Sequence, residues 1–173
     1  IAKKLKTELG FGFSVKIPDN QLALMFLEAS GLLLKPKGDL CFIQKSTSLL
    51  YNSGSKEFRN SLFNQFYVHQ IIDFTLLKND LFKSKGKEVI ENGKPKLDKN
   101  GKTVKGKPTS VESCAVFYKN EIKKEDYITN HIVSRLLKNT KDGLSFEFDY
   151  YDFYEIPRKT ILEDDTIWRC NLL

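Results

Sequence analysis

Residues 83–107 are rich in lysine, a residue type that can bind anionic ligands. The nine lysines of this segment are Lys83, Lys85, Lys87, Lys94, Lys96, Lys99, Lys102, Lys105 and Lys107, against the acidic residues Glu88, Glu91 and Asp98. Ammonium groups at this density favour phosphate binding, and each phosphate contact makes an affinity depend on salt. The alternative is a solvated hairpin whose charges only keep it soluble. We favour DNA contact by the segment, without preferring any one lysine.

Three small polar residues form a second candidate site. Ser46, Thr47 and Ser48 follow the apolar run 39–44, which predicts a strand. Ligands bind at the carboxyl ends of strands in open α/β sheets. These hydroxyls are therefore candidates to line a cleft for a base or for a nucleic-acid backbone. The alternative is that they only satisfy a turn.

The sequence gives little support for a nucleophilic catalytic site or for a metal site. The two histidines, His69 and His131, have no cysteine or histidine at ligand spacing, so we expect no zinc site. No Ser/His/Asp or Cys/His set is recognisable, and we assign no catalytic residue.

Cysteine usage and hydropathy indicate the compartment. Cys41, Cys114 and Cys170 are odd in number, far apart and mostly within apolar runs, which favours reduced, buried thiols in a cytoplasmic protein. No apolar run reaches the length of a membrane span, and no signal-peptide pattern appears in the sequence. The net charge of +6 fits a nucleic-acid partner but is a weak signal by itself.

Three other groups have a structural explanation that we favour. We expect Asp73, between Ile72 and Phe74, to be an acid on an edge strand that faces solvent. Arg59 is expected to form a surface ion pair on a helix. The run 149–154 (Asp-Tyr-Tyr-Asp-Phe-Tyr) is expected to pack against the domain.

The first half of the chain predicts helices around one central strand. Residues 21–34 predict a helix buried on most sides, capped by Asp19 or Asn20 and ended by Pro36. The run 39–44 does not alternate, which predicts a strand covered on both faces. A second helix is expected after residues 53–55, because Phe58, Leu62 and Phe66 repeat at a spacing of four.

Strands at 69–74 and 111–118 are expected to pair antiparallel, with the lysine segment at the tip of their hairpin. Asn-Gly at 92–93 and 100–101 predicts two tight turns within that segment. Residues 125–139 predict an amphipathic helix, because Ile128, Ile132 and Leu136 recur at a spacing of four. A short strand at 144–148 and a packed, extended connector are expected to follow.

Several of these segments contain short motifs whose order and spacing match those of a known enzyme family. Residues 19–43 contain Leu-Leu-Lys-Pro-x-Gly-x-Leu-x-Phe-Ile, and 46–62 contain Ser-x-Ser-Leu-Leu-Tyr-Asn. Further similarity lies at 71–74 (Ile-Ile-Asp-Phe), 80–82 (Asp-Leu-Phe), 111–119 and the final Trp-Arg-x-Asn-Leu-Leu. In their order and spacing these pieces resemble bacterial DNA adenine-N6 methyltransferases of restriction-modification systems. The resemblance is good over 19–119 and looser beyond.

The resemblance implies an α/β fold: the C-terminal portion of a Rossmann-like class I methyltransferase sheet that ends in an antiparallel hairpin, with a basic β-hairpin inserted at 83–107. Residues 1–121 would be the partial methyltransferase domain. Residues 122–173 would be a helix and connector toward a target-recognition region. Phe82 would line the pocket of the flipped base and stack on it; a core phenylalanine is the alternative.

The resemblance also implies S-adenosylmethionine as cofactor, and DNA with a target-recognition domain or specificity subunit as partners. The glycine-containing cofactor loop and the Asn/Asp-Pro-Pro-aromatic motif of the family do not occur in this sequence. Because the chain starts at Ile1, we expect an excised piece that is inactive alone. A non-catalytic, basic nucleic-acid-binding module on the same half-fold is the rival hypothesis. The exposed edge of a half-sheet also carries a risk of dimerisation.

Overall fold

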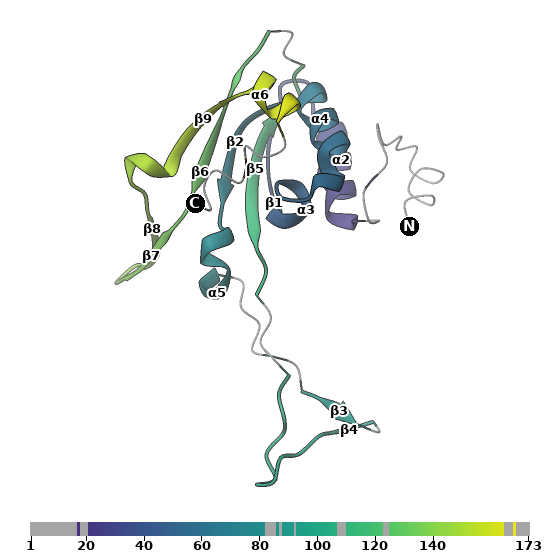
Figure 1. Cartoon of the computed structure of the whole chain (residues 1–173), viewed down its shortest axis with the longest axis vertical. Helices are drawn as coiled ribbons and strands as arrows, with labels where there is room; N and C mark the ends of the chain where they lie inside the picture. Colours follow the sequence, from purple (N-terminus) through teal and green to yellow (C-terminus); the bar gives the residue numbers. More distant parts are fainter. Residues whose placement is uncertain are drawn as a thin grey trace.

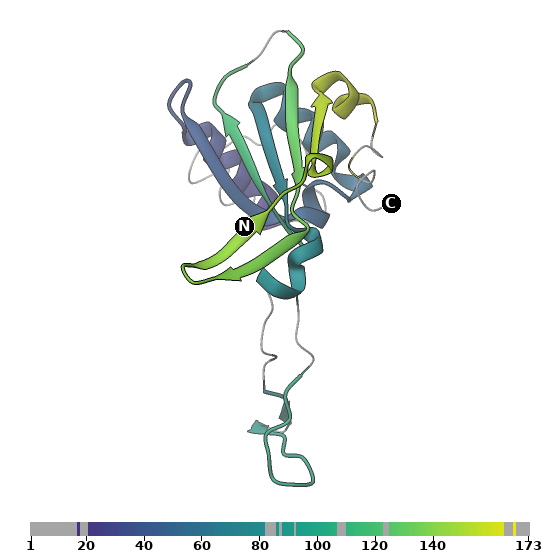
Figure 2. The same cartoon turned by 90° about the vertical axis from the view of Figure 1, so that its left-hand side faces the viewer.

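The computed structural model describes residues 17, 21–81, 86, 88–91, 93–106, 110–122, 125–164 and 168. Its centre is a five-stranded mixed sheet in the order β1-β5-β2-β6-β9 (Figure 1). These strands are β1 (Asp39–Lys45), β2 (Tyr67–Asp73), β5 (Ser113–Lys119), β6 (Ile128–Val133) and β9 (Phe153–Pro157). Helices α2 (Leu22–Leu33) and α4 (Lys56–Gln65) cover one face, and the opposite face is turned to the viewer in Figure 2. The chain thus has the mixed α/β architecture that the sequence predicts.

Helix α2 occurs where the sequence predicts a helix, but it is not buried on most sides. Leu24, Leu27 and Gly31 lie in the core, whereas Phe26 and Leu33 are exposed. The helix packs against β1 on one side only, so its other apolar residues have no covering layer in the described part of the chain. Gln21 occupies the N-cap position without a side-chain hydrogen bond. The predicted caps at positions 19 and 20 fall outside the described residues.

Strand β1 is an edge strand of the described sheet, and the prediction of a strand covered on both faces is wrong for it. It pairs with β5 alone, and its burial alternates along the strand. Cys41 is exposed and the side chain of Ile43 is 59% exposed, because both point to the face opposite α2 and α4. An apolar run without alternation therefore did not indicate two covered faces here.

The antiparallel pairing of β2 with β5 is confirmed. Strand β5 lies between β1 and β2 and is antiparallel to both, so β1 and β2 run in the same direction. The sheet does not end at this hairpin, because β6 pairs parallel with β2, and β9 then pairs antiparallel with β6. The last third of the chain is therefore part of the same sheet.

The predicted helix at 125–139 is wrong. This stretch forms β6 and then β7 (Leu136–Thr140), which pairs with β8 (Gly143–Glu147). A spacing of four residues fits both a helix and a strand, because four is close to one helical turn and is twice the period of a strand. The buried residues of β6 are Thr129, His131 and Val133, which follow the strand period and include two polar side chains.

The final segment is more structured than a connector. The strand predicted at 144–148 is confirmed as β8, followed by the 3-10 turn η4 (Tyr150–Asp152), by β9 and by helix α6 (Arg158–Glu163). Packing of the run 149–154 is confirmed for Tyr154, which lies against the core, and for the buried Asp152. It is wrong for Tyr150, which is 85% exposed, and for Tyr151, which is also exposed. Asp149 and Asp152 form a capping box within η4.

The core lies between the sheet and helices α2, α4 and α6. Phe58, Leu62 and Phe66 of the predicted stripe are all buried, which confirms that part of the prediction. Gly31 is required at a close approach, because a side chain there would collide with the rings of Phe66 and Tyr118. None of the described helices has the length and apolarity needed to cross a membrane.

Candidate functional site

The carboxyl ends of β1 and β2 meet at one edge of the sheet, where β5 begins. Helix α3 (Ser46–Leu49) follows β1 directly, and the 3-10 turn η3 (Thr75–Leu77) follows β2 and leads into α5 (Lys78–Leu81). The hydroxyls of Ser46 and Thr75 lie 2.6 Å apart and join the two connections. We call this the carboxyl edge. It brings together several of the polar residues that the sequence singled out.

Asp73 is the central polar residue of the carboxyl edge, and the prediction that it faces solvent is wrong. Its side chain is 1% exposed, because β2 is an inner strand and Asp73 points to the helix-covered face. One carboxylate oxygen accepts hydrogen bonds from the backbone and the hydroxyl of Thr75, at 2.9 and 2.6 Å. The other accepts one from the hydroxyl of Tyr51. His131 of β6 lies 3.8 Å from the same oxygen.

These contacts decide the ionisation of the group. Burial by itself would raise the pKa of the Asp73 carboxyl, but the interactions with His131, Thr75 and Tyr51 outweigh burial and lower this pKa. The pKa of Tyr51 is raised, first by burial and then by the negative charge of Asp73. Asp73 is therefore a buried carboxylate at neutral pH, and Tyr51 stays a hydrogen-bond donor.

Trp168 closes the cluster beside His131. The two rings meet edge to face with their centroids 5.2 Å apart, and the Trp168 side chain is fully buried. Residue 168 thus folds back onto the sheet, whereas residues 169–173 of the same terminal motif fall outside the described residues. The terminal tryptophan serves the core of this domain.

Arg59 is buried, and the prediction of a surface ion pair is wrong. One of its guanidinium nitrogens, Nη1, donates 2.8 Å hydrogen bonds to the backbone oxygens of Leu49 and Asn52. Those carbonyls close the turn after α3. Arg59 therefore fixes the segment that carries Tyr51 toward Asp73.

The predicted hydroxyl site is mainly structural in this chain. Ser46 and Ser48 are buried, and Ser46 is bonded to Thr75. Thr47 is partly exposed as a residue, although its hydroxyl oxygen is buried. Phe82, the predicted stacking residue, lies outside the described residues. In the sequence, Ser46 and Thr47 come directly after β1, and Phe82 comes directly after α5. Both of these elements end at the carboxyl edge.

Cysteine and metal chemistry stay unsupported. Cys114 is buried, and burial raises the pKa of its thiol, so it is a poor nucleophile. Cys41 is exposed, contrary to the expected burial, and Cys170 is outside the described residues. No group of three or more potential metal-binding side chains occurs in the described part of the chain.

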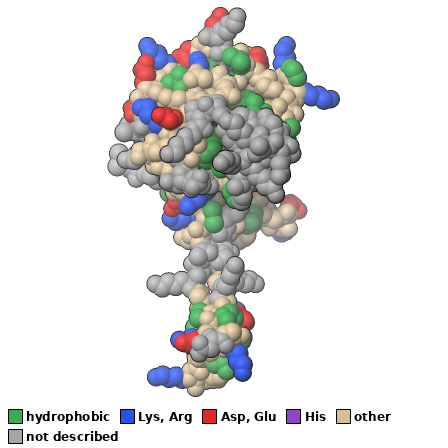
Figure 3. All heavy atoms as spheres, turned by 90° about the vertical axis from the view of Figure 1, so that its right-hand side faces the viewer, with side chains coloured by type: hydrophobic (Ala, Val, Ile, Leu, Met, Phe, Trp, Pro, Cys, Tyr) green, Lys and Arg blue, Asp and Glu red, His purple; other side chains and the backbone are tan. Residues whose placement is uncertain are grey.

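The lysine arm, defined as residues 83–107, leaves the body at the carboxyl edge. Its described part contains β3 (Ile90–Glu91) and β4 (Lys94–Pro95), with further bridges between 88 and 105 and between 97 and 103. Both predicted turns have glycine at positive φ, 75° at Gly93 and 74° at Gly101. Figures 1 and 2 show the arm beyond α5, away from the sheet, and Figure 3 shows basic side chains along it.

Some charged side chains of the arm form contacts within it, and others are available to a binding partner. The Asp98 carboxylate accepts hydrogen bonds from the backbones of Asn100 and Lys102, at 2.8 and 2.9 Å, and so holds the second turn. Lys96 lies 3.3 Å from Glu91. The described lysines of the arm are Lys94, Lys96, Lys99, Lys102 and Lys105, whereas Lys83, Lys85, Lys87 and Lys107 lie outside the described residues. The arm therefore presents an excess of positive charge.

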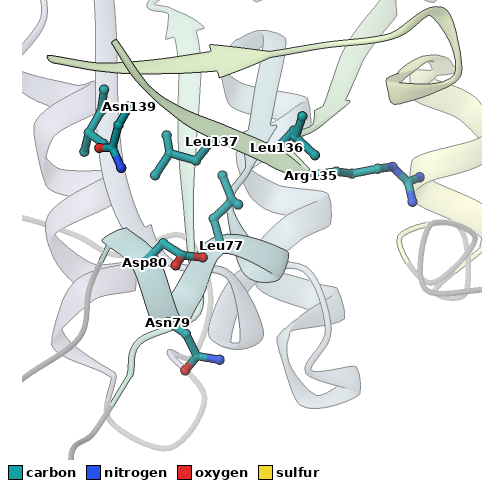
Figure 4. Close-up of a pocket in the computed structure, with 8 residues that line it drawn as sticks. Leu77, Asn79, Asp80, Arg135, Leu136, Leu137 and Asn139 are labelled. Atoms are coloured by element: carbon teal, nitrogen blue, oxygen red, sulfur yellow. The ribbon is translucent and has the colours of Figure 1, made fainter. Parts of the chain in front are cut away.

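A groove of about 480 Å³ lies at the root of the arm. Its walls come from η3 and α5 on one side and from β7 and β8 on the other. The lining residues are Leu77, Asn79, Asp80, Arg135, Leu136, Leu137, Asn139 and Leu144. In Figure 4, Leu77 and Asp80 face Leu137 and Asn139 across the groove. The groove does not follow from the sequence pattern, because the spacing at 125–139 predicts a helix in place of the strands that form one wall.

The other missed residues are Tyr51, Thr75 and His131. One signal was present: an aspartate followed two residues later by threonine at a strand end is a common local turn, in which the carboxylate accepts from the threonine backbone. Tyr51 and His131 reach Asp73 across 22 and 58 residues of chain, and local patterns carry no such information.

Comparison with protein families supports a methyltransferase relationship. Residues 2–82 match the family model described as Eco57I restriction-modification methylase. The resemblance to restriction-modification methyltransferases is therefore confirmed over that segment. No curated protein matches the chain.

Proposed function

Because residues 2–82 match a restriction-modification methylase family, we propose that this chain is part of a DNA adenine-N6 methyltransferase that methylates DNA for a restriction-modification or related defence system. The family match is the observation that carries the proposal. The chain would contribute the sheet edge, one wall of the base pocket and a DNA-contacting arm. The reacting adenine would be flipped out of the duplex, as base-modifying enzymes require.

The topology agrees with this assignment. A Rossmann-like methyltransferase sheet ends in strands of which one is reversed between two that run in the same direction. Strand β5 has that relation to β1 and β2. The strand carrying the adenine-binding loop would then lie beside β1, at its unpaired edge. The same exposed edge is where two copies of the isolated chain would associate.

DNA is the proposed partner of the lysine arm. The arm leaves the carboxyl edge, where ligands of open α/β sheets bind. Its lysines would contact phosphates while the body faces the bases. A target-recognition domain or specificity subunit would supply sequence discrimination. The rival function, a non-catalytic basic binding module, shares the arm but lacks methyl transfer.

The cofactor of the proposed enzyme, S-adenosylmethionine, would supply the methyl group. The described residues do not form a site for it: Asp73, the buried acid nearest the strand ends, is fully engaged by Tyr51 and Thr75. The sequence contains no Pro-Pro dipeptide and no family-type cofactor loop. We therefore assign no residue of this chain to the cofactor.

Phe82→Ala in the whole enzyme tests the base-pocket role. We expect the turnover number for N6-methyladenine formation to fall on the order of tenfold, since stacking on a base contributes about 1–3 kcal/mol. The unfolding midpoint should stay unchanged. Methylation is measured by mass spectrometry of digested DNA, and unfolding by urea titration.

Phe58→Ala is the matched control, because Phe58 is a buried core ring and its loss should lower stability by about 3–5 kcal/mol. If Phe82→Ala lowers stability as Phe58→Ala does, Phe82 is a core residue. If the unmodified whole protein binds DNA but forms no N6-methyladenine, the rival module is correct.

A further inference from the structure

The groove at the root of the lysine arm has the chemistry of a nucleobase site. Its lining combines leucine side chains, among them Leu77, Leu137 and Leu144, with the polar side chains of Asn79, Asp80 and Asn139. Asp80 of α5 and Asn139 of β7 line it from its two sides (Figure 4). Its volume, about 480 Å³, is within the range of small-molecule pockets. A planar base presents apolar faces and a polar edge, which matches this distribution.

The two polar walls favour particular bases. A carboxylate accepts a hydrogen bond from an exocyclic amino group, and a carboxamide donates to an adjacent ring nitrogen. Adenine and cytosine present an amino group next to an acceptor nitrogen, whereas thymine has no amino group. Asp80 and Asn139 together therefore select amino bases.

Among the described residues that line the groove, no cationic side chain points into it to bind the phosphate of a nucleotide. The guanidinium of Arg135 donates to the Asp152 carboxylate at 2.6 Å and lies over the ring of Tyr151 at 5.8 Å. In Figure 4 it points away from the groove. Phosphates would instead meet the lysine arm, which begins two residues after α5 ends at Leu81. A nucleotide could therefore place its base in the groove while its phosphate contacts the adjoining lysine arm.

Aromatic rings extend from the groove over β8 and on to β9. Phe146 of β8 pairs with Leu137 of the groove lining, and the centroid of its ring lies 5.4 Å from that of Phe74 and 6.4 Å from that of Phe148. Phe148 in turn lies 5.9 Å from Phe153. Phe146, Phe148 and Phe153 are each exposed. Partly exposed rings in a row are a platform on which successive unpaired bases stack.

We propose that this groove binds an unpaired adenine or cytosine, other than the methylated base, in a DNA strand held by the lysine arm. The proposal rests on the DNA-binding function proposed above. Ser46, Thr47 and Ser48, the residues that the sequence offers for a base or backbone cleft, do not line the groove. The groove is complete within the described chain, so its base preference belongs to the chain itself.

The test measures how the 173-residue chain binds labelled single strands of dA, dC and dT by fluorescence anisotropy. A duplex of mixed sequence serves as a fourth probe. The groove variant is Asp80→Ala with Asn139→Ala, both at exposed positions. The matched control is Glu155→Ala with Asn130→Ala, an exposed carboxylate and carboxamide that line a hollow beside Tyr67 and His69, which shares no residue with the groove.

The readout is the ratio of affinities, because removing a carboxylate strengthens binding of every strand alike. The native chain should bind dA and dC about tenfold more tightly than dT, the effect of one good base contact. The groove variant should lose this preference, and the control variant should keep it. Circular dichroism checks that both variants fold.

The possible outcomes separate the groove proposal from the proposed DNA-binding function. If the native chain binds all three strands equally, or if the control variant loses the preference as the groove variant does, the groove proposal is overturned while DNA binding stands. If neither single strands nor the duplex bind, the proposed DNA-binding function fails, and the groove proposal fails with it.

Discussion

Replacing Asp73 by alanine is expected to lower the free energy of unfolding by about 3–5 kcal/mol, the usual cost of breaking a buried charged network. The substitution removes the acceptor of three hydrogen bonds and leaves the hydroxyls of Tyr51 and Thr75 without it. Such a loss is a large fraction of the 5–15 kcal/mol that typically stabilises a domain. Urea unfolding followed by tryptophan fluorescence measures it, because Trp168 is the single tryptophan and adjoins the cluster.

Asp73→Asn is the second variant, in case the alanine variant does not fold, and Asp39→Ala is the control. Asp39 is an exposed acid near His69 and Lys119, and its removal should change stability by less than about 1 kcal/mol. An effect of Asp73→Ala no larger than that of Asp39→Ala would contradict the assigned cluster.

The same group makes stability depend on pH. The folded pKa of Asp73 is lowered from an unfolded value of about 3.9, so its contribution is fully present above pH 3.9. That contribution is lost as the pH falls through the folded pKa, because the unfolded chain binds the proton more readily. The stability difference between the native chain and Asp73→Asn should therefore be constant from pH 7 to about 5 and shrink below about pH 4.

Replacing Lys94, Lys99, Lys102 and Lys105 by glutamine is expected to weaken duplex binding on the order of 50-fold near 0.1 M salt. This estimate assumes that two of the four contact phosphates, each adding about 0.9 to the salt slope. The slope of log affinity against log salt should fall by about 1.8. Anisotropy titrations at four salt concentrations give both quantities.

The control for the arm removes the same number of charges elsewhere. Lys35, Lys37, Lys119 and Lys159 lie at the opposite edge of the sheet, near the start of β1 or the end of β9. Their replacement by glutamine should change the slope little. Equal slopes for the two variants would mean that the arm is a solvated hairpin and that binding follows net charge.

The first part of the fold was largely predictable from local pattern. Pro36 after an apolar helix, the Phe58 stripe and the two Asn-Gly turns each depend on the chemistry of a few neighbouring residues, and the structure agrees with all three. The helix predicted at 125–139 was wrong because the apolar spacing of four was ambiguous and the buried face of β6 contains Thr129 and His131.

The candidate site was predicted less well, because its contacts are long-range. The position of Asp73 on an inner strand depends on β6 adding to the sheet, and that strand was predicted as a helix. The groove at the root of the arm requires β7 and β8 for the same reason. Of the parts of the candidate site, only the lysine arm was predicted from the sequence, because its composition differs from that of the rest of the chain.

Hydrogen–deuterium exchange of the 173-residue chain, with and without duplex DNA, tests most directly whether the carboxyl edge and the lysine arm bind DNA. Exposed hairpins exchange fast, so a bound partner is readily detected there. We expect slower exchange at 94–105 and at 77–81 with DNA, and no change at the opposite, amino edge of the sheet, at 67–69 and 127–130. Protection of the amino edge with an unchanged arm would contradict the claim that the carboxyl edge and its arm are the DNA-binding face.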